Sequence, residues 1–436
     1  MKRFLFLQGA ASPFFALLSD RLRERGHTVH KIHFCGGDLV YWWPRPAVSF
    51  RRPFDEWPGF LRDVLKREVI TDVVLFGDKR PVHQPVHPLA KALGITVHVF
   101  EEGYLRPHWM TLERGGVNAH SQLPKDPDWY RQVVQKVPLQ NEDRPFVGKF
   151  RMRAIHDVLY HSGDLMNPLV FRYYTHHAPV HPIREYLWYM RRYPKIKRRL
   201  RTDLADNYTF IAREIPYFLM PLQLYSDSQI ICHSDFCDTF DFIYRALHSF
   251  AQYADSEIHL VIKNHPLDPG IMPYESFVAE VAGELGIAGR VHYFDYGDLV
   301  LLLNHCRGVV TINSTVGTWA LHLHKAVLTL SNPVYNIPGL TSQQSLAEFW
   351  HDPNAPDPEL WSAFRQVLIH GTQINGGFYC ETGMQLALGK ATERLELSQS
   401  PLEELLCRSD IRTPSSLPAR PAPLVPPSQW PTPKPV

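Results

Sequence analysis

The N-terminal part of the chain alternates short apolar runs with longer segments in which apolar residues recur every three or four positions. Short apolar runs bounded by small or polar residues are typical of buried strands, and the periodic segments are typical of amphipathic helices. The pattern predicts strands at 3–7, 28–34, 72–76 and 96–100, and helices at 14–25, 57–67 and 86–93. Strands and helices in alternation form parallel, doubly wound sheets.

The same rhythm returns after residue 211. It predicts strands at 216–223, 258–263, 291–294, 308–312 and 326–330, and helices at 238–253, 274–285, 299–304 and 316–322. We therefore predict an α/β protein with two Rossmann-like domains facing across a cleft, the GT-B-like arrangement of many nucleotide-sugar transferases. The predicted parts are an N-terminal domain (1–150), a helical connector (151–210), a C-terminal domain (211–395) and a tail (396–436). The tail is rich in proline and is expected to be disordered.

Composition narrows the class of protein. The chain has 436 residues, enough for two sizeable cores, and a net charge of +2, which does not demand a nucleic-acid partner. Its six cysteines are scattered, as in a reducing compartment, and Cys232, His233 and Cys237 lack a second ligand pair, so we predict no metal. No apolar run reaches the length of about 18 residues that crosses a membrane. The short apolar N-terminus is interpreted as the first strand of a cytoplasmic enzyme.

The connector is strongly basic between residues 184 and 201. One acid, Glu185, stands among Arg184, Arg191, Arg192, Lys195, Lys197, Arg198, Arg199 and Arg201, and Tyr186, Leu187, Trp188, Tyr189 and Tyr193 are interleaved with them. Three interpretations stay open: a membrane-surface contact, a solvated helix between domains, or a nucleic-acid patch. We favour the membrane contact, because basic and aromatic residues on one helix suit anionic headgroups.

Two adjacent carboxylates, Glu101 and Glu102, follow the apolar run that ends at Phe100. Paired carboxylates at a strand end suit proton transfer or nucleophilic attack at a sugar carbon. The alternative is an acidic helix N-terminus favoured by the helix dipole. Right-handed crossovers place Gln8, Gly9 and Asp78 on the same edge of the sheet, where we predict that they bind substrate.

The second domain supplies groups that suit a phosphate. His265 and Pro266 follow a predicted strand that ends at Lys263, and proline fixes the turn that presents the imidazole. The run Asn313-Ser314-Thr315, followed by Gly317, precedes a predicted helix whose free N–H groups could bind an anion. Asp227, Ser228 and Gln229 add polar groups near the start of this domain. Ordinary capping and loop chemistry is the alternative for each of these groups.

Five stretches together resemble the capsule polysaccharide synthesis and export family: 101–107, 115–119, 227–230, 261–266 and 311–315. The resemblance covers roughly residues 1 to 380 and is nearest to the single-module β-Kdo transferases that start the poly-Kdo linker of group 2 type capsules. It implies CMP-Kdo as donor, lyso-phosphatidylglycerol as acceptor, no metal, a peripheral place on the inner face of the cytoplasmic membrane, and other capsule synthesis or export proteins as partners. Arg106 and Asn118 are assigned to substrate through these motifs. Glu101 or Glu102 would act at the sugar or acceptor, and His265 with Ser314 and Thr315 would hold the CMP phosphate.

The catalytic nucleophile is the open point of this resemblance. Transfer of β-Kdo from CMP-β-Kdo retains configuration, which suggests a covalent carboxylate intermediate. Double-module relatives offer an aspartate downstream of the acidic motif, but the corresponding stretch here, 118–121, contains none. Of the remaining carboxylates, Glu101, Glu102 and Glu113, we prefer Glu102. A transferase for another nucleotide sugar and a non-catalytic export or assembly factor are the alternative functions.

Overall fold

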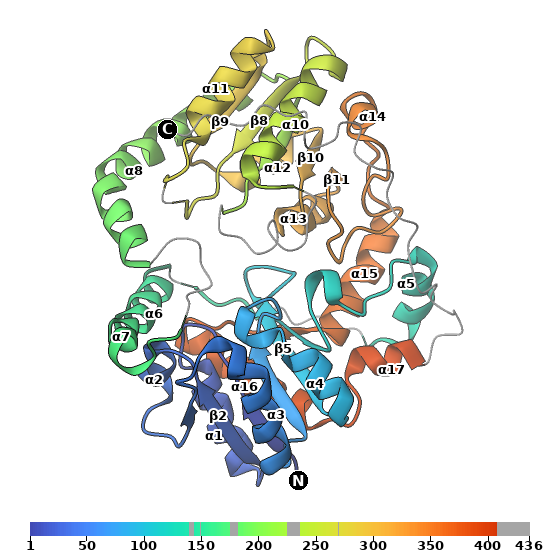
Figure 1. Cartoon of the computed structure of the whole chain (residues 1–436). Coiled ribbons are helices and arrows are strands. Elements are labelled where there is room, and N and C mark those ends of the chain that lie inside the picture. The colour runs from blue at the N-terminus through green and yellow to red at the C-terminus, as the bar shows by residue number, and fades with distance from the viewer. Residues whose placement is uncertain (139–143, 149, 175–181, 225–235, 269, 408–436) are drawn as a thin grey trace.

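The computed structural model describes residues 1–138, 144–148, 150–174, 182–224, 236–268 and 270–407, and it contains two α/β domains (Figure 1). The first domain has a seven-stranded sheet of order β12-β6-β5-β4-β1-β2-β3. Its strands are β1 (Arg3–Phe6), β2 (Thr28–His33), β3 (Val48–Ser49), β4 (Asp72–Phe76), β5 (Thr96–Glu102), β6 (Trp109–Arg114) and β12 (Gln373–Asn375). β1 to β5 run parallel, whereas β6 is antiparallel to both of its neighbours.

Each face of the first sheet carries its own apolar core. Helices α1 (Phe14–Glu24) and α16 (Glu381–Glu396) cover one face with a cluster that includes Phe6 and Phe100. Helices α3 (Trp57–Arg67) and α4 (Val86–Leu93) cover the other face, against Leu75 and Val99. Strands buried on both faces read as continuous apolar runs, which explains why the sequence pattern located them.

The second domain has a five-stranded, parallel sheet of order β11-β10-β7-β8-β9. Its strands are β7 (Tyr217–Pro221), β8 (His259–Lys263), β9 (Val291–Phe294), β10 (Gly308–Thr311) and β11 (Ala326–Thr329). Its helices are α10 (Thr239–Tyr253), α11 (Tyr274–Glu284), α12 (Leu299–His305), α13 (Val316–His322), α14 (Leu346–His351) and α15 (Pro358–Gly371). The predicted arrangement of two α/β domains is confirmed.

The connector is helical, as predicted. It consists of α6 (Phe150–Gly163), α7 (Asn167–Val170) and α8 (Pro182–Ile211), which lie along one side of the molecule and join the two domains (Figure 1). The short helix α5 (Pro127–Val133) packs against α15. Among the described residues, no helix combines the length and the apolar character needed to cross a bilayer.

Two predicted boundaries differ from the structure. Residues up to 395 were assigned to the second domain, but β12 pairs with β6, and α16 packs on α1 through Met384, Leu388 and Leu395. The predicted tail begins too early, because α17 (Pro401–Cys407) buries Leu402 and Leu405 in the core. In both cases apolar periodicity continues past the expected boundary; residues 408–436 lie outside the described residues.

The strand before the carboxylates is also longer than predicted. β5 continues through Glu102, since Glu101 pairs with Thr111 and Glu102 with Met110 in an antiparallel hairpin. The turn of this hairpin begins at Gly103, where an added Cβ would stand 2.1 Å from the carbonyl oxygen of Trp109. Only glycine permits this approach of the two strands.

We expect Gly103→Ala to lower the free energy of unfolding by about 1–3 kcal/mol, because the backbone carbonyl cannot give way as a side chain would. The matched controls are Gly283→Ala and Gly389→Ala, two helical positions where an added Cβ meets nothing within 4 Å. These controls should gain up to about 1 kcal/mol from better helix propensity. Urea unfolding of the three variants measures the effect, and a Gly103→Ala variant as stable as wild type would contradict the steric account.

A candidate active site between the two domains

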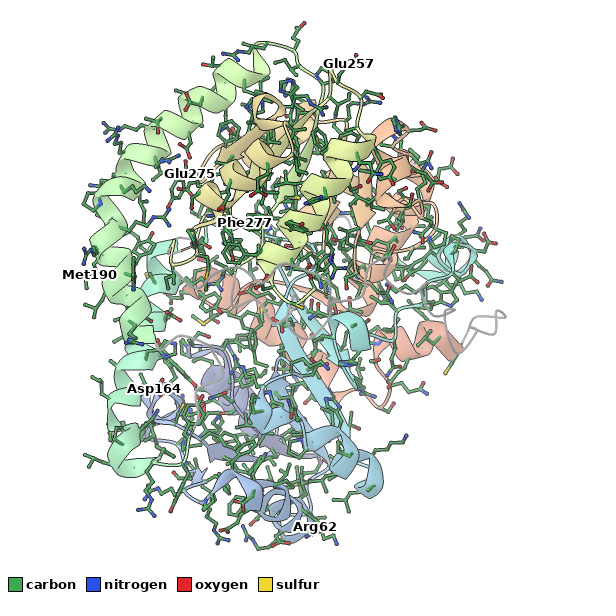
Figure 2. The ribbon with its side chains drawn as sticks, turned by 45° about the horizontal axis from the view of Figure 1, so that its top comes forward. Arg62, Asp164, Met190, Glu257, Glu275 and Phe277 are labelled. Atoms are coloured by element: carbon green, nitrogen blue, oxygen red, sulfur yellow. The ribbon has the colours of Figure 1, made fainter. Side chains whose placement is uncertain are left out.

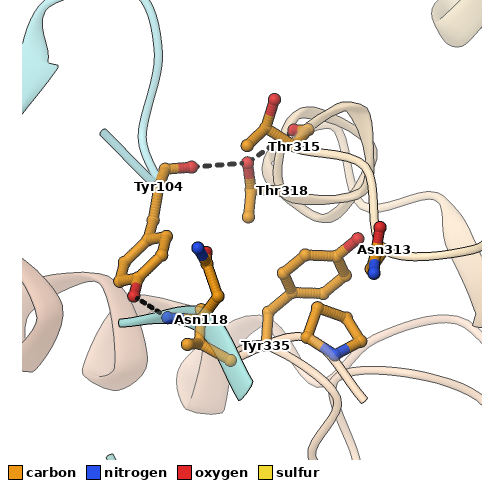
Figure 3. A pocket seen from close by; sticks show the side chains of 8 residues that line it. Tyr104, Asn118, Asn313, Thr315, Thr318 and Tyr335 are labelled. Atoms are coloured by element: carbon orange, nitrogen blue, oxygen red, sulfur yellow. Dashed lines mark hydrogen bonds between the residues drawn. The ribbon is translucent and has the colours of Figure 1, made fainter. Parts of the chain in front are cut away.

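The turn between β5 and β6 connects the two domains. The amide of Tyr104 donates to Oε1 of Gln373 at 3.0 Å, which fixes the turn to the end of the first sheet. From the second domain, the hydroxyl of Thr318 donates to the carbonyl oxygen of Tyr104 at 3.0 Å, and Nε1 of Trp319 donates to that of Arg106 at 3.2 Å. The acidic motif of one domain is therefore held directly against α13 of the other (Figure 3).

A small pocket lies at this junction. Tyr104 and Asn118 line it from the first domain, and the second domain adds Asn313, Thr315, Thr318, Pro333, Val334 and Tyr335 (Figure 3). The backbone amide of Asn118 donates to the Tyr104 hydroxyl at 2.7 Å. This bond fixes the position of Asn118 at the pocket wall. Polar groups from both domains thus converge on one space, as they do where a ligand is bound between domains.

Glu101 and Glu102 leave β5 toward opposite faces of the sheet, because successive side chains of a strand alternate. Oε2 of Glu101 lies on the side of Gly77, 3.3 Å from where a Cβ would stand on that glycine. Burial raises the pKa of Glu101 to about 7, and the charge of Glu102 adds to this, while Arg80 and Arg106 oppose it. A carboxyl with a pKa near neutrality is suited to accept and release protons.

Glu102 has a different environment. One of its carboxylate oxygens lies 3.3 Å from the guanidinium of Arg153, the first-turn arginine of α6. The Arg153 guanidinium stacks over the ring of Tyr379, 4.7 Å from its centroid, and the Arg153 side chain remains 44% exposed. Arg153 and Tyr379 were not among the predicted site residues, since only the fold brings the connector and the loop before α16 to β5.

His265, in the second domain, has a pKa that the charges of this site affect. Its amide donates to Oδ1 of Asn264 at 2.8 Å, and Nδ2 of Asn264 donates to Asp295 at 3.1 Å, so the loop is fixed. The pKa of His265 is lowered to about 4, first by burial and then by Arg106, Lys263 and Arg153. Cations of the first domain and the connector therefore lie near this imidazole.

The tautomer of His265 follows from its contacts. Nδ1 accepts a hydrogen bond from the amide of Leu267 at 3.1 Å, so in the neutral ring the proton is on Nε2. The sequence suggested that a histidine here would protonate a leaving phosphate. With a pKa of about 4, His265 is neutral near pH 7 and offers a hydrogen bond from Nε2 instead. Pro266 follows it and is exposed.

Lys263 ends β8, as the sequence predicted, but its ammonium contacts backbone carbonyl oxygens. It is buried, and its ammonium donates to the carbonyl oxygens of Asn264 at 2.9 Å and Asp295 at 3.4 Å. Burial lowers its pKa to about 8. The ammonium therefore holds the backbone of the His265 loop. A direct contact with phosphate would require these hydrogen bonds to break.

The 313–317 loop is built as the sequence predicted, at the end of β10 and the start of α13. Oδ1 of Asn313 accepts from Gln223 at 2.9 Å, and Oγ of Ser314 accepts from the amide of Val316 at 3.2 Å. Thr315 lines the pocket, and Gly317 is required because a Cβ would stand 2.4 Å from the Tyr335 hydroxyl. Ser314 therefore makes a local turn just before α13, whose N-cap, Thr315, forms no side-chain cap, and Asn313 and Thr315 line the pocket.

Gln8, Gly9 and Asp78, near β1 and β4, were predicted to bind substrate, and each makes a contact within the protein. Gln8 is buried, and its amide donates to the hydroxyls of Tyr160 and Tyr174, both at 3.1 Å, so it positions the connector. The carbonyl of Gly9 accepts from Arg80 at 2.9 Å. Asp78 accepts from His120 at 2.8 Å. Arg106 is exposed at the site, and Asp227, Ser228 and Gln229 lie outside the described residues.

A further carboxylate, which is buried, supports the pocket. Glu113, on β6, accepts hydrogen bonds from the Tyr104 hydroxyl at 2.7 Å and the Ser121 hydroxyl at 2.5 Å. Burial raises the pKa of Glu113 to about 7, although these two hydroxyls favour its charged form. In the described part of the chain, His, Cys, Asp and Glu side chains form no cluster of three that could hold a metal, and the absence of a metal requirement stays a prediction.

Comparison with known proteins agrees with the resemblance seen in the sequence. The model of the family described as "Capsule polysaccharide biosynthesis protein" matches residues 71–379. This chain belongs to the capsule polysaccharide biosynthesis family. It is 36% identical over 389 residues to the capsule polysaccharide export protein KpsS of Escherichia coli, covering 87% of this chain and 97% of that relative.

Two further proteins show the range of the similarity. The capsule polysaccharide modification protein LipB of Neisseria meningitidis is 36% identical over 390 residues, covering 86% of this capsule family member and 91% of LipB. Among solved structures, the KpsC β-Kdo 2,7 transferase of Thermosulfurimonas dismutans has a TM-score of 0.41 at 13% identity, covering 89% of this chain and 100% of that one. No conclusion about activity rests on that structural match.

The pH dependence of stability tests the burial of Glu113. Its folded pKa of about 7 exceeds the roughly 4.3 of an unfolded glutamate, so its contribution is complete below about pH 4 and is lost as pH rises through 7. We expect Glu113→Gln to gain about 2–3 kcal/mol of unfolding free energy relative to wild type between pH 5 and pH 8. Urea unfolding across this range is the measurement, with exposed Glu257→Gln as control. Curves that stay parallel would show that Glu113 titrates normally.

Proposed function

We propose that this capsule family protein is a retaining glycosyltransferase that moves Kdo from CMP-Kdo to lyso-phosphatidylglycerol, starting the lipid-linked end of a capsule polysaccharide. The observation that carries the proposal is that the same two arginines act on groups of both domains: Arg106 opposes the raised pKa of Glu101 and lowers the pKa of His265, and Arg153 pairs with Glu102 and also lowers the pKa of His265. Family membership and the capsule names of the relatives support the pathway.

The charges of the site support an acidic donor. CMP-Kdo carries a phosphodiester and a sugar carboxylate close together, and both are anions. Arg80, Arg106 and Arg153 surround the carboxylates of the first domain, and Nε2 of neutral His265 can donate to a phosphate oxygen. Guanidinium groups bind carboxylate and phosphate in a forked geometry, so this set suits a sugar acid better than a neutral sugar.

The different environments of the two glutamates suggest their roles. Glu102, paired with Arg153, is the proposed nucleophile: its oxygen forms a bond to the anomeric carbon as the bond to the CMP phosphate breaks and CMP leaves with the electron pair. An acceptor hydroxyl then attacks the same carbon and displaces Glu102. The proton of the acceptor hydroxyl passes to Glu101, whose raised pKa suits a base that must later release that proton.

The lipid acceptor places the reaction at a membrane. We propose that the protein works as a peripheral protein on the inner face of the cytoplasmic membrane, where capsule synthesis and export proteins are its expected partners. The basic connector supplies cations for anionic headgroups. No nucleic-acid role is proposed.

The first test is transfer itself. Purified protein is incubated with CMP-Kdo and detergent-dispersed lyso-phosphatidylglycerol, and mass spectrometry of the lipid detects the added sugar. We expect Glu102→Gln to lower turnover roughly a thousandfold or more with CMP affinity unchanged, because the amide cannot form the intermediate. Glu101→Gln should lose roughly 10²–10⁴-fold and the pH limb near 7, and Glu257→Gln serves as control. Full activity in Glu102→Gln would remove this residue from the mechanism.

The second test separates donor classes. A nucleotide that binds only the folded protein raises its stability, by about 2.7 kcal/mol at a hundred times the dissociation constant. We expect CMP to raise the melting temperature and UDP at equal concentration to leave it unchanged. Stabilisation by UDP alone would replace the CMP-sugar donor with a UDP-sugar, and stabilisation by neither would favour a non-catalytic role.

A further inference from the structure

Exposed apolar side chains concentrate on the connector. Of the twenty-six large hydrophobic side chains that are exposed in the described residues, fifteen lie between residues 150 and 211. Single exposed apolar residues are normal on any protein, but contiguous ones mark a surface that is covered in use. The connector helices therefore present a surface that the described residues leave uncovered.

Helix α6 has two distinct faces. On the inner face, Arg153 pairs with Glu102, His156 contacts the Tyr41 hydroxyl at 2.7 Å, and Tyr160 is buried. The outer face carries Met152, Ile155, Val158 and Leu159, which are 37%, 47%, 49% and 45% exposed, together with exposed Arg151. Apolar residues thus dominate a face that a soluble helix normally keeps polar.

The apolar surface continues past the end of α6. Leu165 and Met166, in the turn before α7, are 65% and 49% exposed, and Leu169 on α7 is 90% exposed. The N-terminal part of α8 adjoins α6, since the Tyr186 hydroxyl donates to Asp157 at 2.5 Å. Both views of the molecule place α6, α7 and α8 along the same side (Figures 1 and 2).

Helix α8 separates its arginines into two groups. Arg192 pairs with Asp295 at 3.0 Å, and Arg199 donates to Glu275 on α11 at 2.6 Å, so both arginines hold α8 to the second domain. They are not available to headgroups, contrary to the sequence-based expectation for the whole stretch. The exposed cations are Arg184, Arg191, Lys195, Lys197, Arg198 and Arg201.

The exposed cations of α8 lie among apolar residues. Leu187, Trp188 and Met190 are 57%, 49% and 63% exposed, and Figure 2 shows Met190 at the outer edge of the molecule. Apolar side chains flanked by arginine and lysine are typical of helices that lie in a membrane interface. The positive charge favours a partner with a dense negative surface.

We propose that the outer faces of α6, α7 and the N-terminal half of α8 form a membrane-binding surface that inserts apolar side chains into an anionic bilayer. Met152, Ile155, Leu159 and Leu169 enter the boundary of the acyl chains, while the exposed cations of α8 contact anionic headgroups. The basic contact was predicted on residues 184–201 of α8; this surface adds α6, which binds by burial of apolar area. It serves the proposed lipid acceptor but does not depend on the identity of the sugar donor.

Flotation with vesicles tests the proposal. We expect wild type to float with phosphatidylcholine vesicles containing phosphatidylglycerol, and much less with phosphatidylcholine alone. Ile155→Asp/Leu159→Asp/Leu169→Asp should abolish binding at both low and high salt, because apolar insertion is not screened. Arg191→Gln/Lys195→Gln/Arg198→Gln should weaken binding roughly a hundredfold at low salt, at about fivefold per cation.

The controls separate insertion from unfolding and from self-association. Leu93→Asp/Tyr253→Asp/Leu397→Asp changes three exposed apolar residues elsewhere and should float as wild type does. Leu169→Asp alone tests the most exposed position with least risk to folding. Flotation of the apolar triple variant like wild type, or no flotation of wild type, would overturn the proposal. A dimer that light scattering detects in wild type but not in the apolar triple variant would also overturn the proposal, because a second copy would then cover this face.

The readout is independent of the proposed chemistry. The apolar triple variant should transfer sugar at the wild-type rate to detergent-dispersed acceptor and lose transfer to acceptor in vesicles, whereas Glu102→Gln loses both. Loss in detergent as well as in vesicles would show that the triple variant damages the fold.

Discussion

The arrangement of this protein depends on how closely the backbone of β5 approaches that of β6. The approach is possible because Gly103 has no side chain, and it places the following turn where both domains contact it. Gln373 holds Tyr104 from the first sheet, and Thr318 holds the same residue from α13. The side chains of Gln373 and Thr318 that bond this turn are both buried, so these hydrogen bonds hold the domains together more strongly than exposed contacts would.

This constraint gives two neighbouring glutamates different chemistry. A strand that continues to Glu102 sends Glu101 and Glu102 to opposite faces, so each meets its own surroundings. Glu101 is partly buried and its pKa is raised to about 7, while Glu102 pairs with Arg153. The antiparallel hairpin thus gives two neighbouring carboxyl groups different surroundings, which a loop beginning after Phe100 would not impose.

The strands and helices were predictable where burial imposes a period, as in β1, β4 and the whole second sheet. The carboxylates, His265 and the 313–317 loop were predictable as groups because each follows a buried strand. The return of β12 and α16 to the first domain was not, since local pattern does not say which sheet a strand joins. Arg153 and Tyr379 escaped prediction for the same reason, because their contacts with the site join distant segments. Lys263 ends a predicted strand, which suggested a phosphate ligand, but its ammonium donates to a backbone carbonyl oxygen.

Helix α6 connects two properties that the sequence presents separately. Its inner face carries Arg153 to Glu102, and its outer face carries Ile155 and Leu159 to the surface. Both faces belong to one helix of 14 residues, so the element that borders the proposed membrane surface also carries the guanidinium that pairs with Glu102. An enzyme that took its acceptor from a bilayer would gain from this arrangement, since one helix would join the surface that holds the acceptor to the carboxylates of the site.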